Sequence, residues 1–287
     1  MSVALPSWPG SDQRTHLGVD SIARQRFSSL RSAFDRNRLI ELMVLGLLFV
    51  IYNVVRALPS TTPQVAVEHA HLILSWEGPL FRHLELPLNQ WLAATPVVAV
   101  AASYFYAGLH YLATPAILLL ARRRGGWLYW RGYWTLVLAS ALALAGYALF
   151  PTAPPRLVPD LGIIDVLRAY ADFGWWGSAA SAPRGIGDAT NQYAAMPSMH
   201  FGWALWCSIQ MWGFGSRRWR AVAIAYPSIL AVVVLATGNH FAIDVLAGAA
   251  CVVVAQTAVV LIHRNWPKTV SGHRLTPPKV RQPVPSR

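Results

Sequence analysis

The sequence predicts an all-α, polytopic integral membrane protein, with a six-transmembrane-helix bundle and an interfacial amphipathic helix. The first observation behind this is composition: 55% of the 287 residues are hydrophobic and 13% are charged, whereas a soluble domain carries about a quarter charged residues. The second is a series of apolar runs close to the length of about 20 residues that a spanning helix needs. The third is the placement of arginine and lysine at the ends of these runs.

Six apolar runs are the candidate spans, with ends that a sequence pattern fixes only to within a few residues. The first reads LIELMVLGLLFVIYNVVRAL, and we expect it to act as an uncleaved anchor, because the residues before it are polar and rich in arginine. The fourth is the shortest of the six. The runs are residues 39–58, 98–121, 132–150, 199–215, 219–237 and 242–263.

The remaining segments divide the chain into one membrane domain between two tails. Residues 1–38 predict a basic cytoplasmic tail, and residues 265–287, rich in proline, lysine and arginine, predict a disordered basic tail. Residues 59–92 mix apolar positions with Glu, His and Arg, a pattern typical of an amphipathic helix at the membrane surface. We therefore expect a single membrane domain over residues 39–264.

The cations predict how the bundle is oriented. A net charge of +12 would also suit a nucleic-acid-binding protein, but here the cations flank apolar runs, where they face anionic lipid. The two tails, the second-to-third connection and the fourth-to-fifth connection carry most of them, and all four lie on one side of a six-span bundle. By the positive-inside rule, both termini are cytoplasmic in a multi-pass inner-membrane protein. The other connections, near residues 59–92, 151–198 and 238–241, then face the extracytoplasmic side.

Two polar segments mark the outer ends of the third and fourth spans. In Pro151-Thr-Ala-Pro-Pro-Arg156, proline ends the helix and leaves Arg156 near the interface, where it can hold phosphate oxygens or snorkel to headgroups. In Met196-Pro-Ser-Met-His200, Ser198 stands at a helix N-terminus, whose free N–H groups and dipole favour an anion. Ser198 can equally serve as a plain N-cap. His200 would lie within reach of the bound anion.

The third segment, Gly238-Asn-His240-Phe-Ala-Ile-Asp244, opens the sixth span. His240 and Asp244 are four residues apart, which puts them on one face of a helix. The carboxylate of Asp244 can accept the Nδ1–H of His240 and leave Nε2 free as a nucleophile. An ionisable residue at the edge of an apolar span is costly and usually functional, although a structural hydrogen bond between helices is the alternative.

Because the three segments share the outer ends of three spans, their combination predicts a site for phosphoryl chemistry. A phosphoryl group at the start of the fourth span would be attacked in line by His240, while His200 protonates the departing oxygen. Arg156, Ser198 and backbone N–H groups would stabilise the charge that develops. This arrangement calls for no metal and no cofactor.

These residues carry a resemblance to a known family. P-S-x-H followed by H-x3-D is similar to the second and third motifs of the type 2 phosphatidic acid phosphatase superfamily. The P-T-A-P-P-R segment, the M-P-S-M-H box and the interfacial helix after the first span resemble its inositolphosphorylceramide synthase-like branch. The resemblance covers roughly residues 40–264. It implies a helical bundle, a phosphohistidine intermediate, metal-independent catalysis and, for that branch, inositolphosphotransferase activity between lipids.

The chain departs from the superfamily pattern at five positions. They are Leu149 (lysine in the first motif), Leu157 (proline in the first motif), Met199 (glycine in the second motif), and Val233 and Val234 (serine and arginine in the third motif). Two phosphate-binding cations are therefore missing, and Arg184 is a candidate replacement for one of them. Because a phosphodiester carries less charge at phosphorus than a monoester, these losses favour phosphotransfer over monoester hydrolysis.

We therefore expect a lipid phosphotransferase that acts at the extracytoplasmic face on a lipid phosphate or phosphodiester, with a polyol or lipid alcohol as acceptor. Hydrolysis of a lipid phosphate or a polyprenyl diphosphate is the alternative reaction. A lipid-binding or transport protein without catalysis is the alternative class, but the spans show no broken-helix repeat and the polar residues gather at one face. No nucleic acid is expected as a partner, and the oligomeric state is not fixed by the sequence.

Other polar and aromatic residues have structural explanations beside functional ones. Three histidines in the surface segment match no strong metal-ligand spacing, and the glutamates near them suit solvated partners; these are His69, His71, His83, Glu68, Glu77 and Glu85. In the second span, core packing is favoured over a headgroup pocket for Tyr104, Tyr106, His110 and Tyr111. Interfacial residues that cover or touch the site are predicted at Trp175, Trp176, Asp188, Asn191 and Tyr193.

Overall fold

The computed structural model describes residues 39–48, 50–51, 54, 63–176 and 192–265. Contacts divide the chain into two units, Met1–Val54 and Val55–Arg287. In the first unit Leu39–Leu48 is helical, so the first predicted span is described over part of its length. In the second unit the described residues form helices, and the one pairing of extended segments among them is a bridge between Thr152 and Ala194. The predicted all-α class is confirmed.

Four helices are long and apolar enough to cross a membrane: α4 (Pro96–Arg124), α5 (Gly126–Leu149), α8 (Arg217–Ala236) and α9 (Ala242–Asn265). Large apolar side chains stand exposed along their outer faces, among them Val97, Leu112, Ile224 and Leu246. Contiguous apolar surface of this kind is unfavourable in water and is expected where lipid is the solvent. The second unit is therefore membrane-embedded, but the described residues hold four such helices instead of the predicted six.

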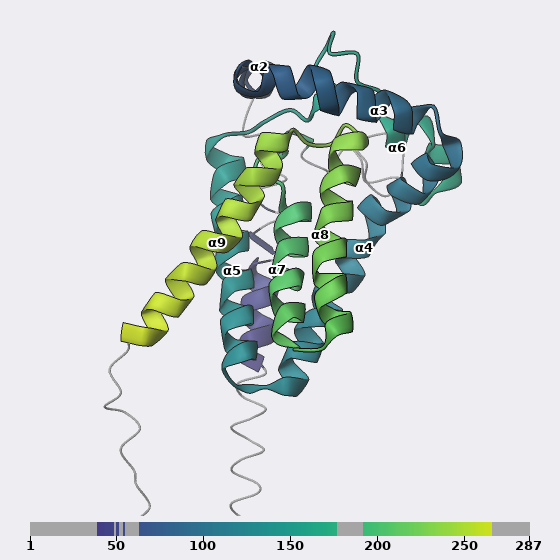
Figure 1. The fold of residues 1–287 in the computed structure, drawn as a ribbon. Helices are drawn as coiled ribbons and strands as arrows, with labels where there is room; N and C mark the ends of the chain where they lie inside the picture. Colours follow the sequence, from purple (N-terminus) through teal and green to yellow (C-terminus); the bar gives the residue numbers. More distant parts are fainter. Residues whose placement is uncertain (1–38, 49, 52–53, 55–62, 177–191, 266–287) are drawn as a thin grey trace, which may run out of the picture. The chain divides into compact units, whose positions relative to one another are not determined.

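The helix α7 (Met199–Gly213) accounts for part of this difference. Its 15 residues rise about 22 Å, short of the roughly 30 Å hydrocarbon core. It lies inside the bundle among α4, α5, α8 and α9 (Figure 1), and its Trp206 and Cys207 are fully buried. Irregular backbone at membrane depth is tolerated where protein surrounds it, so the chain can continue as a non-helical segment before Met199.

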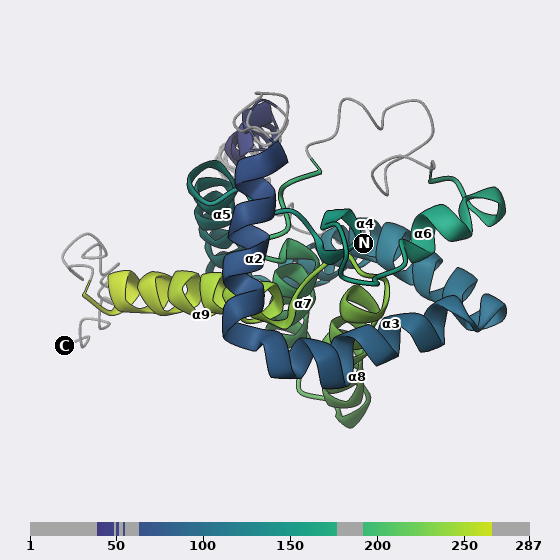
Figure 2. The ribbon, with the colours of Figure 1, turned by 90° about the horizontal axis from the view of Figure 1, so that it is seen from above.

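One helical run crosses the end of the bundle where α7 and α9 begin (Figure 1). It consists of α2 (Pro63–Leu80), the π-helical turn η1 (Phe81–Glu85) and α3 (Leu86–Ala93). Pro79 lacks a backbone N–H and a π-helical turn follows it, and both features bend helices. Figure 2 shows α2 and α3 running in different directions on either side of this point. The predicted helix over residues 59–92 is confirmed from residue 63, while its place at the membrane interface stays a prediction.

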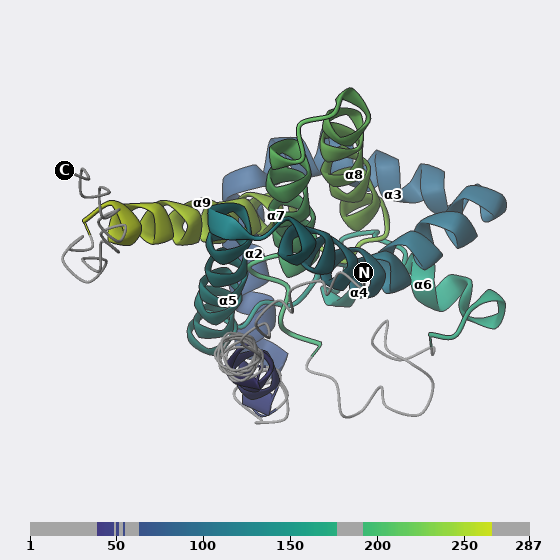
Figure 3. The ribbon, with the colours of Figure 1, turned by 90° about the horizontal axis from the view of Figure 1, so that it is seen from below.

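The opposite end of the bundle carries the basic connections, and Figure 3 views the bundle from this side. Arg122, Arg123 and Arg124 end α4, and the guanidinium of Arg124 lies 3.8 Å from the ring centroid of Phe214, between α7 and α8. Trp127 at the start of α5 stacks on His263 at the end of α9, with ring centroids 3.8 Å apart. The two predicted cationic connections therefore share one end of the bundle, as the sequence predicted. That this end is cytoplasmic stays a prediction.

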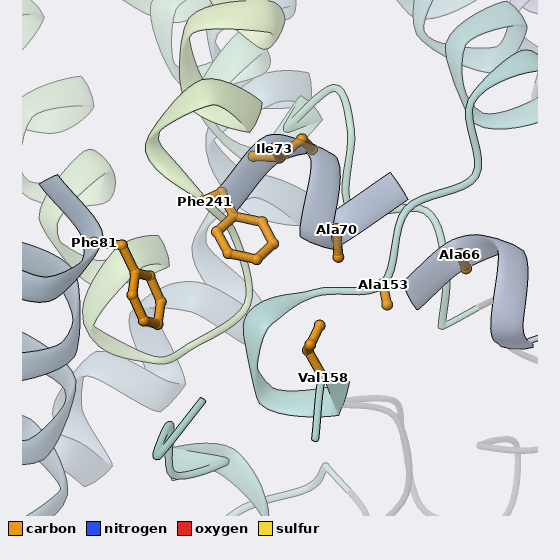
Figure 4. Close-up of a cluster of buried hydrophobic side chains, with 7 residues drawn as sticks. All are labelled: Ala66, Ala70, Ile73, Phe81, Ala153, Val158 and Phe241. Atoms are coloured by element: carbon orange, nitrogen blue, oxygen red, sulfur yellow. The ribbon is translucent and has the colours of Figure 1, made fainter. Parts of the chain in front are cut away.

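The long connection from α5 to α7 packs against the crossing run. It contains the short helical turns η2 (Pro155–Leu157), α6 (Val166–Ala169) and η3 (Ala171–Phe173). A cluster of buried apolar side chains joins this connection to α2, η1 and the segment before α9 (Figure 4); its members are Ala66, Ala70, Ile73, Phe81, Ala153, Val158 and Phe241. Since Phe241 follows His240 directly, this cluster fixes the backbone beside the predicted nucleophile.

Trp176 also belongs to the interior, although the sequence predicted a residue that covers the site. Its side chain is fully buried, its indole N–H donates to the carbonyl of Leu167 at 2.9 Å, and its ring meets Tyr104 edge-on at 5.0 Å. Trp175, by contrast, is exposed. Trp176 therefore ties the connection to α4, which leaves Trp175 as the residue of the pair that can face the solvent or lipid.

Candidate active site

The turn between α8 and α9 places His240 in the interior. Gly238 takes a positive φ of 72°, and a Cβ at this position would lie 2.6 Å from the side chain of Ile163, so both the conformation and the space call for glycine. Three residues into α9 comes Asp244, whose Oδ2 accepts the backbone N–H of Phe241 at 2.9 Å. An acidic side chain that reaches back to the residue before its helix is a capping arrangement. It holds the turn closed with His240 directly before the capped residue.

Two acceptors lie near the Nδ1 atom of His240. The carbonyl oxygen of Ala195 is 2.9 Å away and Oδ2 of Asp244 is 3.5 Å away. The sequence predicted Asp244 as the partner of this nitrogen, whereas the backbone carbonyl is in fact closer. Because both acceptors need a proton on Nδ1, they favour the tautomer in which Nε2 carries a free lone pair. The side chains of His240 and Asp244 are 5% and 0% exposed, so this pair is held inside the protein.

The start of α7 approaches the same pair. The N–H of Ser198 donates to the backbone carbonyl of Asp244 at 2.9 Å, and Gly248 of α9 lies so near that a Cβ there would be 2.1 Å from the Ser198 carbonyl oxygen. On the other side, the hydroxyl of Tyr147 donates to the carbonyl of Pro197 at 3.0 Å. Contacts with α5 and α9 therefore fix where α7 begins.

This helix start has the features of an anion site. Ser198 precedes α7 without capping it, and its buried Oγ has no hydrogen-bond partner within the described part of the chain. The N–H groups of the first helical turn have no acceptor within the helix, and the helix dipole is positive at this end. A bound phosphoryl oxygen would satisfy both the hydroxyl and the free N–H groups. Buried, unpartnered polar atoms call for such an explanation.

His200 lies on the first turn of α7, and its ring centroid is 5.7 Å from that of His240. Tyr106 stacks on the His200 ring at 4.3 Å, and His110 meets it edge-on at 4.5 Å. Both come from α4, which the sequence predicted as a source of core packing more than of headgroup contacts. They serve as packing here, because they hold the ring of His200 beside that of His240.

Arg156 reaches the site from the connection after α5, but two protein groups already engage it. Its Nε donates to Oδ1 of Asn239 at 2.9 Å, and its Nη1 pairs with Oδ2 of Asp165 at 3.1 Å. Its backbone N–H donates to the carbonyl of Gly238, so Arg156 braces the turn that carries His240, the predicted nucleophile. No described residue accepts a hydrogen bond from Nη2, which leaves this group for the phosphate contact that the sequence predicted.

Several contacts in the candidate site were not expected from the sequence. Asp165 and Ala195 hold Arg156 and His240, yet neither belongs to a recognisable motif. Glu77 and Glu85 were interpreted as solvated, whereas both side chains are buried and bind the start of α9. A local signal was lacking, because Glu68, Glu77 and Glu85 all stand in one polar-and-apolar run, and its sequence alone does not show that Glu77 and Glu85 are buried while Glu68 is exposed.

The remaining predicted residues lie apart from the site or outside the described residues. Nδ1 of His69 lies 2.7 Å from the carbonyl oxygen of Pro151, and the His69 ring stacks on Phe150. His71 and His83 are exposed, and no group of three or more His, Cys, Asp or Glu side chains in the described ranges could hold a metal ion. The candidate phosphate ligand Arg184 and the neighbouring Asp188 and Asn191 lie outside the described residues.

Comparison with known proteins bears on the same region. A family model described as the PAP2 superfamily matches residues 71–258, which include all three motif segments. Neither the search of curated proteins nor that of solved structures gave a significant match. The matched range begins in α2 and ends in α9, so it takes in the crossing helical run as well as the bundle.

Proposed function

Since the chain belongs to the PAP2 superfamily, whose members are phosphatases and phosphotransferases, we propose that it is a lipid phosphotransferase acting through a phosphohistidine on His240. The observation that carries this proposal is the position of His240, with Nδ1 near the carbonyl of Ala195 and the carboxylate of Asp244, and with His200 beside it. A nucleophile with its tautomer set by neighbours and a second titratable ring alongside is the usual arrangement for covalent catalysis with acid–base help.

The reaction proceeds in two displacements at phosphorus. In the first, Nε2 of His240 attacks, the bond from phosphorus to the lipid oxygen breaks, and His200 gives its proton to that oxygen. In the second, His200 takes a proton from the acceptor hydroxyl, the acceptor oxygen attacks phosphorus, and the nitrogen–phosphorus bond breaks. The start of α7, Ser198 and Nη2 of Arg156 stabilise the phosphoryl oxygens in both steps.

A phosphodiester donor and an alcohol acceptor are favoured over phosphomonoester hydrolysis. Arg156 is the described cation that touches the turn carrying His240, and Asp165 already neutralises part of its charge. Val234, which replaces the arginine of the superfamily motif, is fully buried and apolar. A site with so little positive charge is better matched to a singly charged diester, as in phosphoinositol transfer, than to a doubly charged monoester. Hydrolysis with water as acceptor is the second candidate, because the superfamily includes both reactions.

The mass of the covalent intermediate distinguishes the two reactions. Purified protein in detergent is incubated with a mixed lipid extract, quenched at alkaline pH and digested, and the peptide containing His240 is analysed by mass spectrometry. We expect an adduct that carries a phosphorylated polyol, together with a neutral lipid product. An adduct of bare phosphate would make the protein a phosphatase.

Two histidine variants serve as controls for this experiment. His240→Ala should lose the adduct and all turnover, while His83→Ala, at an exposed position on η1, should behave as the wild type. Turnover retained by His240→Ala would refute the nucleophile. Absence of any adduct or product in the wild type with all donors and acceptors would favour a binding or transport role.

A further inference from the structure

Two glutamates of the crossing helical run bind the start of α9, one turn away from the proposed nucleophile. Oε2 of Glu77 accepts the N–H of Ile243 at 2.9 Å, and Oε1 of Glu85 accepts the N–H of Ala242 at 3.1 Å. Both side chains come from outside the bundle helices and are nevertheless buried, at 5% and 1% exposed. They therefore cap α9 from a separate element, which is a costly arrangement unless their charge is compensated.

Among the residues that the structure describes, no cation near the pair supplies that compensation. Asp244 is the ionisable group that faces the pair from α9, and its charge repels both carboxylates. Arg82 and His83 of η1 are exposed, and the described residues form no cluster that could hold a metal ion. With both glutamates ionised, Oε1 of Glu77 and Oε2 of Glu85 would be buried without a donor.

A proton on one of the two glutamates removes a buried negative charge and supplies a hydrogen-bond donor. Burial is the largest cause that raises the pKa of each carboxyl. Repulsion adds to it, from Asp244 on Glu77 and from Glu77 and Asp244 on Glu85, and the pKa of Glu85 rises to about 8. When Glu85 is protonated, its hydroxyl donates to the carboxylate of Glu77, so the two free oxygens satisfy each other. One negative charge then remains at the positive end of α9, where the helix dipole favours it.

We propose that Glu77 and Glu85 share one proton and act as a carboxyl–carboxylate pair that positions the start of α9, and through it Asp244 and His240. They are positioning residues, because neither contacts the proposed reacting atoms. The shared proton also makes the pair sensitive to pH. Once it is lost, the pair and Asp244 bring three negative charges to one helix start, and their repulsion loosens the turn that holds His240.

Infrared spectroscopy tests the shared proton without any need for turnover, so failure here is separate from failure of the proposed reaction. At pH 7 the wild type should show the carbonyl stretch of a protonated carboxylic acid, and this band should titrate away with a midpoint near 8. In Glu85→Gln the band should be absent, because the amide replaces the acid as donor to Glu77. In Glu77→Gln it should also be absent, because Glu85 can then ionise and accept from the amide.

A matched control and a kinetic split complete the test. Glu68→Gln changes an exposed carboxyl on α2 and should keep the band. Because the amide can donate to Glu77 in place of the acid, Glu85→Gln should keep kcat within about threefold of the wild type. This variant should also lose the part of the alkaline fall in kcat whose midpoint lies near 8. Glu85→Ala should lower kcat about tenfold or more with little change in KM, because the α7 anion site is intact. A wild type without the acid band at pH 7, or pH profiles of wild type and Glu85→Gln that superimpose, would overturn the proposal.

Discussion

Gly248 allows α9 to touch the start of α7, and adding one methyl group there should separate the two halves of the site. A Cβ on Gly248 would lie 2.1 Å from the carbonyl oxygen of Ser198, whereas ordinary contacts begin at 3.4 Å. In Gly248→Ala the backbone of Ser198 must therefore move by about 1.3 Å, the difference between the two distances. No flexible side chain can absorb this shift, because the atom that blocks the methyl group belongs to the main chain.

The energetic consequence can be estimated from the contacts that this shift breaks. The hydrogen bond from the N–H of Ser198 to the carbonyl of Asp244, 2.9 Å long, would be lost at a cost of about 1 kcal/mol. Overpacking adds about 1–3 kcal/mol, and the higher helix propensity of alanine returns about 0.5–1 kcal/mol. We expect Gly248→Ala to lower the free energy of unfolding by about 1–3.5 kcal/mol. A displacement of this size between His240 and the bound phosphoryl group should lower kcat by about 10²-fold.

The assay pairs kcat with unfolding in detergent, and Gly108→Ala provides the control. A Cβ at Gly108, also inside a spanning helix, would meet nothing within 4 Å, so this variant should keep full activity and be equally or slightly more stable. Gly202→Ala should be intermediate, because its Cβ would lie 3.2 Å from the carbonyl of Gly248. If Gly248→Ala matched Gly108→Ala in both activity and stability, the close approach of α7 and α9 would not hold in the protein.

Three other perturbations compare activity with stability for individual residues of the site and of the glutamate pair. Ser198→Ala should lower kcat/KM about tenfold or more without lowering the free energy of unfolding, because the Oγ that it removes has no hydrogen-bond partner among the described residues. Activity assays and unfolding in detergent check this. A loss of stability parallel to the loss of activity would contradict it. Arg156→Lys should lower both kcat/KM and the free energy of unfolding, because one ammonium cannot reproduce the two directed hydrogen bonds to Asn239 and Asp165. If this variant unfolds like the wild type, Arg156 does not brace the turn. The pKa of Glu85 is raised from 4.5 to about 8, so between these pH values the folded state holds a proton that the unfolded state releases. The free energy of unfolding should therefore fall as the pH rises from about 4.5 to about 8. Unfolding in detergent across this range should depend less on pH in Glu85→Gln than in the wild type.

The parts of the site that depend on short-range spacing could be predicted from the sequence. His240 and Asp244 follow from a four-residue spacing, and Ser198 and His200 follow from a proline-marked helix start, which local geometry largely determines. The structure brings these four residues together. Their chemical roles remain predictions, as does that of Arg156, because no contact with a substrate tests them.

The missed contacts depend on packing between elements far apart in the chain. Nothing local distinguishes the carbonyl of Ala195, since every residue has one, and the burial of Glu77 and Glu85 depends on α2 crossing the start of α9. The six predicted spans are not all confirmed: within the described ranges four helices are long enough to cross a membrane, and the first predicted span is described over only part of its length. The helix α7 begins at the predicted residue, Met199, but its 15 residues are fewer than a span needs, and hydropathy alone does not separate such a short buried helix from a spanning one.

The acceptor nearest to Nδ1 of His240 is a peptide carbonyl, so side-chain substitution cannot remove this hydrogen bond. Every substitution at Ala195 keeps the carbonyl, so a library of side-chain variants would report only the steric fit of this buried position. A drop in activity there would be assigned to packing, and the true partner of the histidine would escape detection. Replacing the amide by an ester at the bond after Ala195, through chemical synthesis or an incorporated hydroxy acid, weakens the acceptor while preserving shape. Backbone chemistry is therefore the route by which the orientation of this histidine can be studied.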